Sequence, residues 1–185
     1  MSSENKHTDE IEKFKRFVIQ QTNEEIIEEG QIPAVINILC YDPNETKPVL
    51  ALIPVPEDLM KAGFTKNALT NVVIPKILQK LEEEGVGPLC ISLITEGWMW
   101  EVEKDKKLSA QEIEEIKKTK EKREVVRITF ETENFSEVRI FDKMGTKKNA
   151  KGEYVEGVYL KEREDQKKER QASQFSNLFK KTRYA

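Results

Sequence analysis

Residues 89–101 read LCISLITEGWMWE and form the most apolar stretch of the chain. A run of this length, rich in Ile, Leu and Trp, is typical of a strand that is buried inside a sheet. The composition changes abruptly after it, since residues 101–124 consist largely of Lys and Glu. The stretch therefore predicts a central strand that is followed by a charged insertion.

Hydrophobic periodicity places the other elements around this strand. Helices are predicted over residues 8–29, from Thr65 to Glu84, where Pro75 should kink the helix or divide it in two, and over residues 110–122; further strands are predicted over residues 34–41, 48–55, 123–133, 137–142 and 154–160. Turn residues at 42–45 join the first two strands into a hairpin. The order predicts an α+β fold with a mainly antiparallel sheet of about five to six strands, helices packed on one face, and a flexible C-terminal tail.

Three local signals set the expected helix ends. Thr8 is a suitable N-cap for the first helix, and Gly30 is a suitable stop. Ser109 and Glu112 have the spacing of a capping box, which predicts that the third helix begins at Ala110. This helix is polar on most sides, so we expect it to lie on the surface or to project from it.

Composition favours one domain with a lean core, because 37% of the residues are apolar and 35% are charged. We expect a disordered start over residues 1–7. A single α+β domain then covers residues 8–160 and contains the charged insertion 102–122. Residues 161–185 are predicted to form a charged interaction tail with a basic end.

The charge is distributed unevenly along the chain. The net charge is −3, but residues 166–185 contain six Lys or Arg and one Glu, which is +5 and leaves −8 for the rest. An acidic body is a poor nucleic-acid binder, because phosphate contacts need clustered basic residues. We therefore expect no direct nucleic-acid partner, although the basic tail is suited to an acidic surface.

Residue types exclude several classes of site. Cys40 and Cys90 each lie in an apolar run and are predicted to be buried thiols. The single histidine, His7, leaves no His-based triad and no His/Cys metal set, so no metal and no cofactor are expected. No apolar run is long enough to span a membrane, and residues 1–10 do not read as a signal peptide. The predicted compartment is the cytoplasm.

One candidate site lies at the end of the central strand. If the strands on either side of the insertion are neighbours, Glu96 meets Arg123 near the edge of the sheet, beside Trp98 and Glu124. One interpretation is a small polar pocket, with a Trp platform, one cation and two carboxylates for acid-base or ligand chemistry. The other is a salt bridge that fixes the register of the strands, with Trp98 in the core.

The same segment carries a resemblance. Thr95-Glu96-Gly97-Trp98-Met99 and the later Arg123-Glu124-Val125-Val126 are similar to a pattern in a family of functionally uncharacterised small bacterial and phage proteins. The resemblance covers roughly a third of the chain, from residue 92 to 142. It implies a small cytoplasmic protein, in the host cytoplasm if it is phage-encoded, and it implies no activity.

The C-terminal tail holds the second candidate site. Gln174, Phe175, Leu178 and Phe179 lie in a charged segment, where apolar side chains indicate docking rather than solvation. Their order resembles the short peptide with which bacterial replication proteins bind the DNA sliding clamp. In that peptide the Gln supplies a donor and an acceptor, and the Leu and Phe fill an apolar pocket. The alternative is a tail that packs on its own domain or on a second copy.

The sequence thus favours a non-enzymatic accessory or regulatory protein, related to phage, which acts through protein–protein contacts. The insertion 104–123 is either a partner-binding arm or a solvated helix held by Glu–Lys pairs. A small enzyme or ligand-binding domain at Glu96, Trp98, Arg123 and Glu124 stays open as an alternative. A virion-associated structural protein that forms homo-oligomers is a third.

Overall fold

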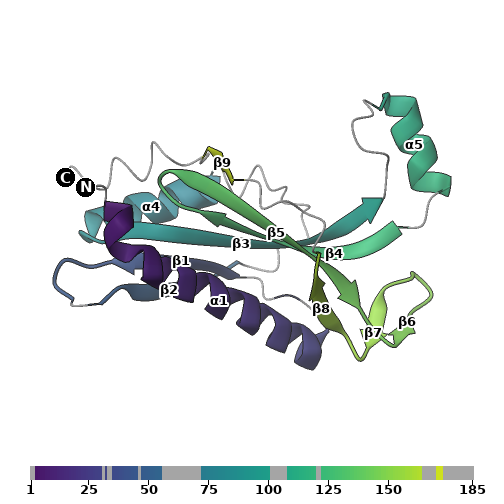
Figure 1. Ribbon diagram of the computed structural model, residues 1–185, viewed down its shortest axis with the longest axis horizontal. Coiled ribbons are helices and arrows are strands. Elements are labelled where there is room, and N and C mark those ends of the chain that lie inside the picture. Colours follow the sequence, from purple (N-terminus) through teal and green to yellow (C-terminus); the bar gives the residue numbers. More distant parts are fainter. Residues whose placement is uncertain are drawn as a thin grey trace.

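A computed structural model describes residues 3–30, 32, 35–45, 47–55, 72–100, 108–119, 122–163 and 170–172. Its centre is a curled antiparallel sheet in the order β2-β1-β3-β4-β5-β8, and β9 also pairs with β5 (Figure 1). The helices are α1 (Ser3–Glu29), α4 (Ile74–Glu83) and α5 (Ala110–Thr119); the strands are β1 (Val35–Tyr41), β2 (Val49–Pro54), β3 (Gly87–Trp100), β4 (Lys122–Glu131), β5 (Phe135–Met144), β6 (Lys147–Lys148), β7 (Tyr154–Glu156), β8 (Tyr159–Glu162) and β9 (Arg170–Ala172). The predicted α+β class and antiparallel sheet are confirmed.

Helices α1 and α4 lie on opposite faces of the sheet, where the sequence predicted a single face. In β1, Ile36 and Ile38 pack in the cluster around α4, whereas Leu39 packs in the cluster around α1. Successive side chains of a strand point to opposite faces, so the sheet is covered on both sides. This explains the unbroken apolar run at the start of β3, in which residues 88–93 are all buried.

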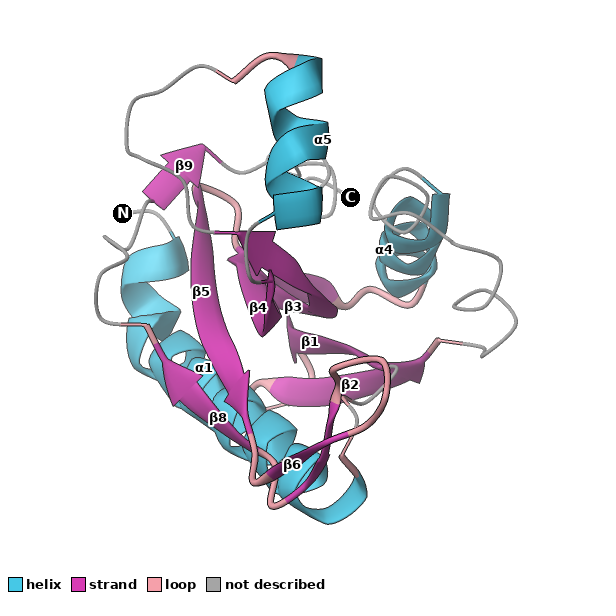
Figure 2. Cartoon of the chain, turned by 90° about the vertical axis from the view of Figure 1, so that its right-hand side faces the viewer, coloured by secondary structure: helices cyan, strands magenta, loops and turns pink. Residues whose placement is uncertain are grey.

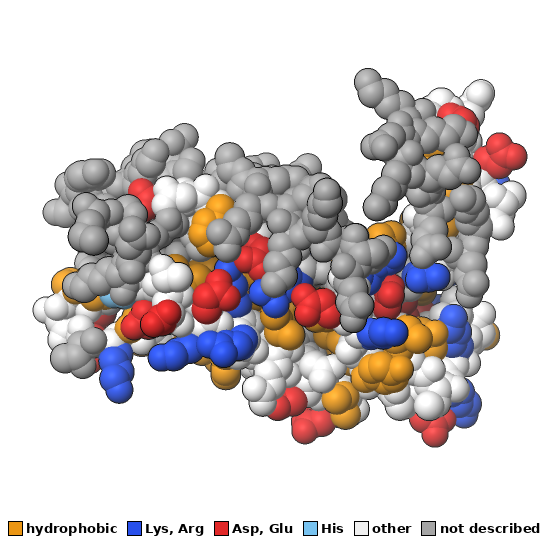
Figure 3. Space-filling view, viewed as in Figure 1, with side chains coloured by type: hydrophobic (Ala, Val, Ile, Leu, Met, Phe, Trp, Pro, Cys, Tyr) orange, Lys and Arg blue, Asp and Glu red, His pale blue; other side chains and the backbone are white. Residues whose placement is uncertain are grey.

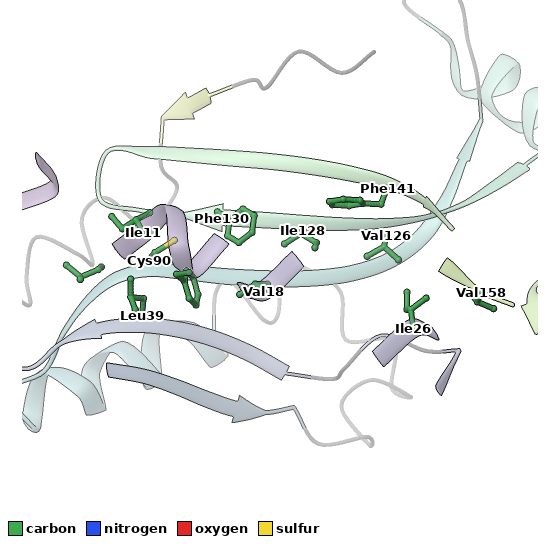
Figure 4. Close-up of a cluster of buried hydrophobic side chains, with 12 residues drawn as sticks. Ile11, Val18, Ile26, Leu39, Cys90, Val126, Ile128, Phe130, Phe141 and Val158 are labelled. Atoms are coloured by element: carbon green, nitrogen blue, oxygen red, sulfur yellow. The ribbon is translucent and has the colours of Figure 1, made fainter. Parts of the chain in front are cut away.

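The larger core lies between α1 and the sheet. Figure 4 shows the side chains of α1 and of the strands β1, β3, β4 and β5 meeting in one layer. Its buried members are Ile11, Phe14, Val18, Ile26, Leu39, Leu89, Cys90, Val126, Ile128, Phe130, Phe141 and Val158. The α1 residues follow the 3.6-residue period, which places them on one stripe of the helix.

The ends of α1 follow local signals with one difference. Gly30 has φ of 71° and donates its N–H to the Ile26 carbonyl at 2.9 Å, so it closes the helix as predicted. Residues 3–7, expected to be disordered, belong to α1 instead. His7 has non-helical angles and stacks on Tyr41 with ring centroids 5.3 Å apart, so the helix is interrupted immediately before Thr8.

Two further elements depart from the expected bounds. Pro75 lies in the first turn of α4, where its missing N–H is tolerated, and Val72 and Val73 immediately before this helix have a π-helical conformation, so the regular α-helix begins beside the proline. The expected start at Thr65 lies outside the described residues. The strand predicted over 154–160 is divided into β7 and β8, because Gly157 has φ of 58° and turns the chain between them.

The beginning of the predicted tail belongs to the sheet. Residues up to Glu162 continue β8, and β9 adds Arg170–Ala172 to the other end of β5. The domain therefore extends beyond residue 160, the predicted boundary. Residues 173–185 lie outside the described residues.

A buried ion pair connects α1 to β5. The Lys15 side chain is fully buried, and its Nζ donates to Glu137 Oε2 at 2.7 Å and to Glu12 Oε1 at 2.8 Å. Glu137 also accepts a bond from Arg139 Nε at 2.9 Å. Burial by itself raises the pKa of Glu137, but the hydrogen bonds from Lys15 and Arg139 outweigh it and hold that pKa below its usual value.

We expect Glu137→Ala to lower the free energy of unfolding by about 3 kcal/mol, because it leaves the buried Lys15 ammonium with one partner, Glu12, which is itself partly exposed. Urea unfolding measures the change. Glu114→Ala is the matched control, since it removes an exposed Lys117 pair and should change the free energy by less than about 0.5 kcal/mol. Equal effects of the two substitutions would contradict the role of the buried pair.

The Glu137 contribution also depends on pH. Because its folded pKa is depressed, its stabilisation is complete above the unfolded value near 4.5 and is lost as the pH falls through the lower folded value. The difference between wild type and Glu137→Gln should therefore shrink on acidification below that pH. Unfolding curves over an acid pH series test this, and a constant difference would contradict it.

Candidate functional site

The second half of β3 carries the candidate site. Beyond Leu93, β3 has no register partner in β1, and among the described residues it pairs only with β4. In this overhang Glu96 lies opposite Val126, and Trp98 lies opposite Glu124. Directly opposed residues of an antiparallel pair share a face, and Val126 belongs to the α1 core. Glu96, Trp98 and Glu124 therefore lie together on the α1 face, as the sequence hypothesis required.

The cation between the two carboxylates is Lys143 of β5. Its Nζ lies 3.0 Å from Glu96 Oε1 and 2.9 Å from Glu124 Oε1. The Lys143 side chain is 5% exposed and that of Glu124 is 9% exposed, whereas that of Glu96 is 34% exposed. The cluster joins β3, β4 and β5 through two charge-assisted hydrogen bonds.

These bonds keep the lysine charged. Burial lowers the pKa of Lys143, but the hydrogen bonds to Glu124 and Glu96 outweigh it, so its pKa lies above the usual value. A lysine nucleophile needs the opposite shift, toward neutrality. The arrangement is therefore that of a largely buried ion cluster in which one ammonium engages two carboxylates.

Arg123 does not share this face. It lies opposite Met99, one residue out of phase with Glu124, so its side chain starts from the other face of the sheet. The expected partnership of Glu96 and Arg123 is replaced by that of Glu96 and Lys143. Of the two interpretations, the geometry favours a salt bridge that fixes strand register over a polar pocket. The cation of this salt bridge is Lys143 rather than Arg123.

The two tryptophans border the cluster. The Trp98 ring is half-buried, and Lys122 Nζ lies 3.9 Å from its centroid, so a cation of the same chain occupies the predicted Trp platform. Tyr154 donates its backbone N–H to Glu124 Oε2 over 3.4 Å, and its ring receives Lys148 Nζ at 4.7 Å. Trp100 Nε1 is buried and has no hydrogen-bond partner in the part of the chain that the structure describes.

The overhang also carries α5 away from the body. Figures 1 and 2 show this helix standing apart from the sheet, at the far end of β3 and β4. The predicted capping box is present: Ser109 N donates to Glu112 Oε2 at 2.9 Å, and Glu112 N donates to Ser109 Oγ at 3.3 Å. None of the residues of α5 is buried, and Ile113 is 40% exposed. A shallow hollow along the helix is lined by Leu108, Glu112, Glu115, Ile116 and Thr119.

Sequence reasoning missed Lys143 because it ended the fifth strand at residue 142. The signal was present, since Lys143 follows Phe141 at the strand period of two and therefore points to the buried face. Lys15 was missed in the same way, although it lies on the helix stripe of Ile11 and Val18. In both cases a charged residue at an apolar position was the signal.

The remaining predicted residues are placed as follows. Cys40 and Cys90 are buried free thiols, as predicted, and burial raises the pKa of Cys40 to about 12 and that of Cys90 further. Within the described ranges, no group of acidic, Cys and His residues is arranged to hold a metal ion. Searched over those same residues, no helix has the length and apolar character needed to cross a membrane. Gln174, Phe175, Leu178 and Phe179 lie outside the described residues.

Comparison with known proteins adds no assignment. No protein-family model matches the chain, and no curated protein or solved structure is significantly similar to it.

We expect Lys143→Met to lower the free energy of unfolding by about 2–3 kcal/mol, because it leaves Glu96 and Glu124 unpaired and facing each other. Adding Glu124→Gln to this variant should recover part of the loss, since one of the two like charges is removed. Lys161→Met, at an exposed position of the adjacent β8, is the matched control. Chemical denaturation measures the free energy of unfolding of all four proteins. A Lys143→Met variant as stable as wild type would contradict the role of Lys143 in joining the two carboxylates.

The Lys143 contribution has an alkaline signature. Because the folded pKa is raised, the stabilisation is complete below the unfolded value near 10.5 and is lost as the pH rises through the folded value. The stability gap between wild type and Lys143→Met should therefore be constant at neutral pH and narrow in strong alkali. A gap that persists above the folded pKa would contradict this assignment.

Proposed function

We propose that this protein is a non-catalytic accessory or regulatory protein that acts through protein–protein contacts. The observation that carries the proposal is α5, a helix that is held off the body and has no buried residue. The candidate pocket supports it as well, because Lys143 engages both carboxylates and Lys122 covers the Trp98 ring.

The physical argument concerns the stability of α5. An isolated helix of ten residues is marginal in water, because most helices in proteins are stabilised by packing an apolar face. Two local interactions stabilise this helix: the Ser109–Glu112 box and the Lys117–Glu114 pair at 2.7 Å. A partner that covers Ile113 and Ile116 would add tertiary contacts to it.

The side chains of α5 indicate the chemistry of that partner. Glu112 and Glu115 line the hollow beside Ile116, and Lys117 and Lys118 follow only in the last turn. An apolar groove with a basic rim complements this face, in the mode by which amphipathic helices bind grooves. None of the residues of α5 is buried, and in the space-filling view acidic side chains lie at the outer edge of this part of the molecule (Figure 3).

The C-terminal tail is the second proposed contact. β9 ends at Ala172, which pairs with Phe135, and Gln174 follows two residues later in the sequence. The apolar residues Phe175, Leu178 and Phe179 in this charged segment are suited to docking into a partner. The partner that its residue order fits is a bacterial DNA sliding clamp, and a phage-related accessory role agrees with that.

We expect the double substitution Ile113→Ala and Ile116→Ala to weaken capture of the α5 partner at least tenfold. Alanine keeps or raises helix propensity while removing apolar surface that the partner would bury. Pull-down from a bacterial lysate with quantitative mass spectrometry measures the loss. Ile27→Ala with Val155→Ala is the matched control, because these exposed residues lie on α1 and β7. If both variants capture the same proteins in the same amounts as wild type, the α5 proposal is overturned.

The tail is tested separately by a chain that ends at Ala172, which keeps the β9 pairing with β5 intact. Purified bacterial sliding clamp should bind the full chain and not the truncated one. Gln174→Ala alone should weaken binding while leaving the thermal unfolding of the domain unchanged. If full and truncated chains bind the clamp equally, or if neither binds, the clamp assignment fails and the α5 proposal is unaffected.

A further inference from the structure

The strand β2 forms an open edge of the sheet. Among the described residues it pairs only with β1, so one side of its backbone has no strand partner. Its side chains are apolar and accessible, since Val49 is 45%, Leu50 37% and Leu52 50% exposed. An edge of this kind is a template for another strand.

The opposite edge of the sheet is constructed differently. It consists of two short pieces, β8 with four residues and β9 with three, and β8 ends in the charged Lys161 and Glu162. Short strands and charges are the features with which natural edges avoid pairing. Residues 48–56 read PVLALIPVP and contain no charge. The two edges therefore differ: short, charged strands protect one of them, whereas β2 is longer and uncharged, and prolines restrict its pairing only near its ends.

Two prolines limit what β2 can pair with. Pro48 precedes the strand and Pro54 ends it, and neither has an N–H to donate to a ladder. The segment between them is residues 49–53, and its middle residue is Ala51. A second copy of β2 can oppose its own residues 49–53 to this whole segment only if the pairing is centred on Ala51.

We propose that β2 binds a second copy of this chain, strand against strand and antiparallel, with the twofold axis at Ala51. In this register Leu50 lies opposite Leu52 of the second copy, and Pro48 lies opposite Pro54 of the second copy. The nearest charged residue, Lys47, falls opposite Val55, so no like charges are opposed between residues 47 and 55.

The faces of the two sheets also match in this register. Leu50 lies opposite Leu39 of β1, and Leu39 packs in the α1 core, so Leu50 and Leu52 lie on the α1 face. Opposing Leu50 to Leu52 keeps both copies of α1 on one side of a continuous sheet. A shift by one residue would place the leucines against the other face. The symmetry is the isologous type that most dimers use.

We expect the wild-type full chain to show a concentration-dependent monomer–dimer equilibrium in analytical ultracentrifugation at micromolar concentrations. Leu52→Lys should shift it to monomer, with at least a tenfold weaker association, because two lysines would then face the opposing edge. Val155→Lys, at 53% exposure on β7, is the matched control and should dimerise like wild type. Circular dichroism confirms that each variant is folded.

A disulfide test checks the register. Opposed residues of an antiparallel pair have Cα atoms about 4.5–5.5 Å apart, within disulfide range. Mixing Leu50→Cys with Leu52→Cys should therefore give oxidised dimers, whereas each variant alone pairs only diagonally, at about 7–8 Å. Cys40 and Cys90 are buried and do not compete.

Three outcomes would overturn the proposal. The first is a wild type that is monomeric at all concentrations, and the second is a Leu52→Lys variant that dimerises as wild type does. The third is a monomer whose β2 amides are protected from hydrogen exchange, which would show that another segment of the chain covers this edge. Equal cross-linking of the single variants and of the mixture would reject the Ala51-centred register.

Discussion

The structure depends on one constraint, the length of β3 relative to its two neighbours. β3 has fourteen residues, but β1 pairs with it only from Gly87 to Leu93, while β4 pairs with it from Ile91 to Trp100. The first half of β3 is therefore central in the sheet and is covered on both faces, by α1 and α4. The second half is an overhang with one neighbour. The division into a packed body and a projecting arm follows from this mismatch.

The overhang requires its own means of cohesion, because β1 no longer pairs with β3 beyond Leu93. Lys143 provides one by joining Glu96 and Glu124, and so connects three strands where β1 is no longer present. The Trp98–Lys122 contact adds a second link across β3 and β4. The same residues that suggested a pocket thus hold the base of the arm that presents α5. This agrees with the proposed function, because a helix that binds a partner is better positioned when the strands that carry it are rigid.

Two buried lysines each connect separate elements of the fold. Lys15 connects α1 to β5, and Lys143 connects β5 to β3 and β4. Buried ion pairs are weak evidence for added stability, since desolvation offsets much of the attraction. Their geometry is more informative, because each lysine accepts only one placement of the elements around it. We infer that they specify how α1 and the overhang are positioned, while apolar burial supplies the driving force.

Local elements could be predicted from the sequence, because periodicity and caps act within a few residues. The run at Leu89–Leu93, the capping box at Ser109 and the stop at Gly30 each describe a local preference, and each is present in the fold. Three features emerge only from the folded chain: the face that each helix covers, the pairing of Glu96 with Lys143 rather than Arg123, and the place of β2 at an edge of the described sheet. These outcomes depend on strand register and order, which bring together residues far apart in the chain. No local pattern encodes them, because a shift of one residue exchanges the two faces of a strand.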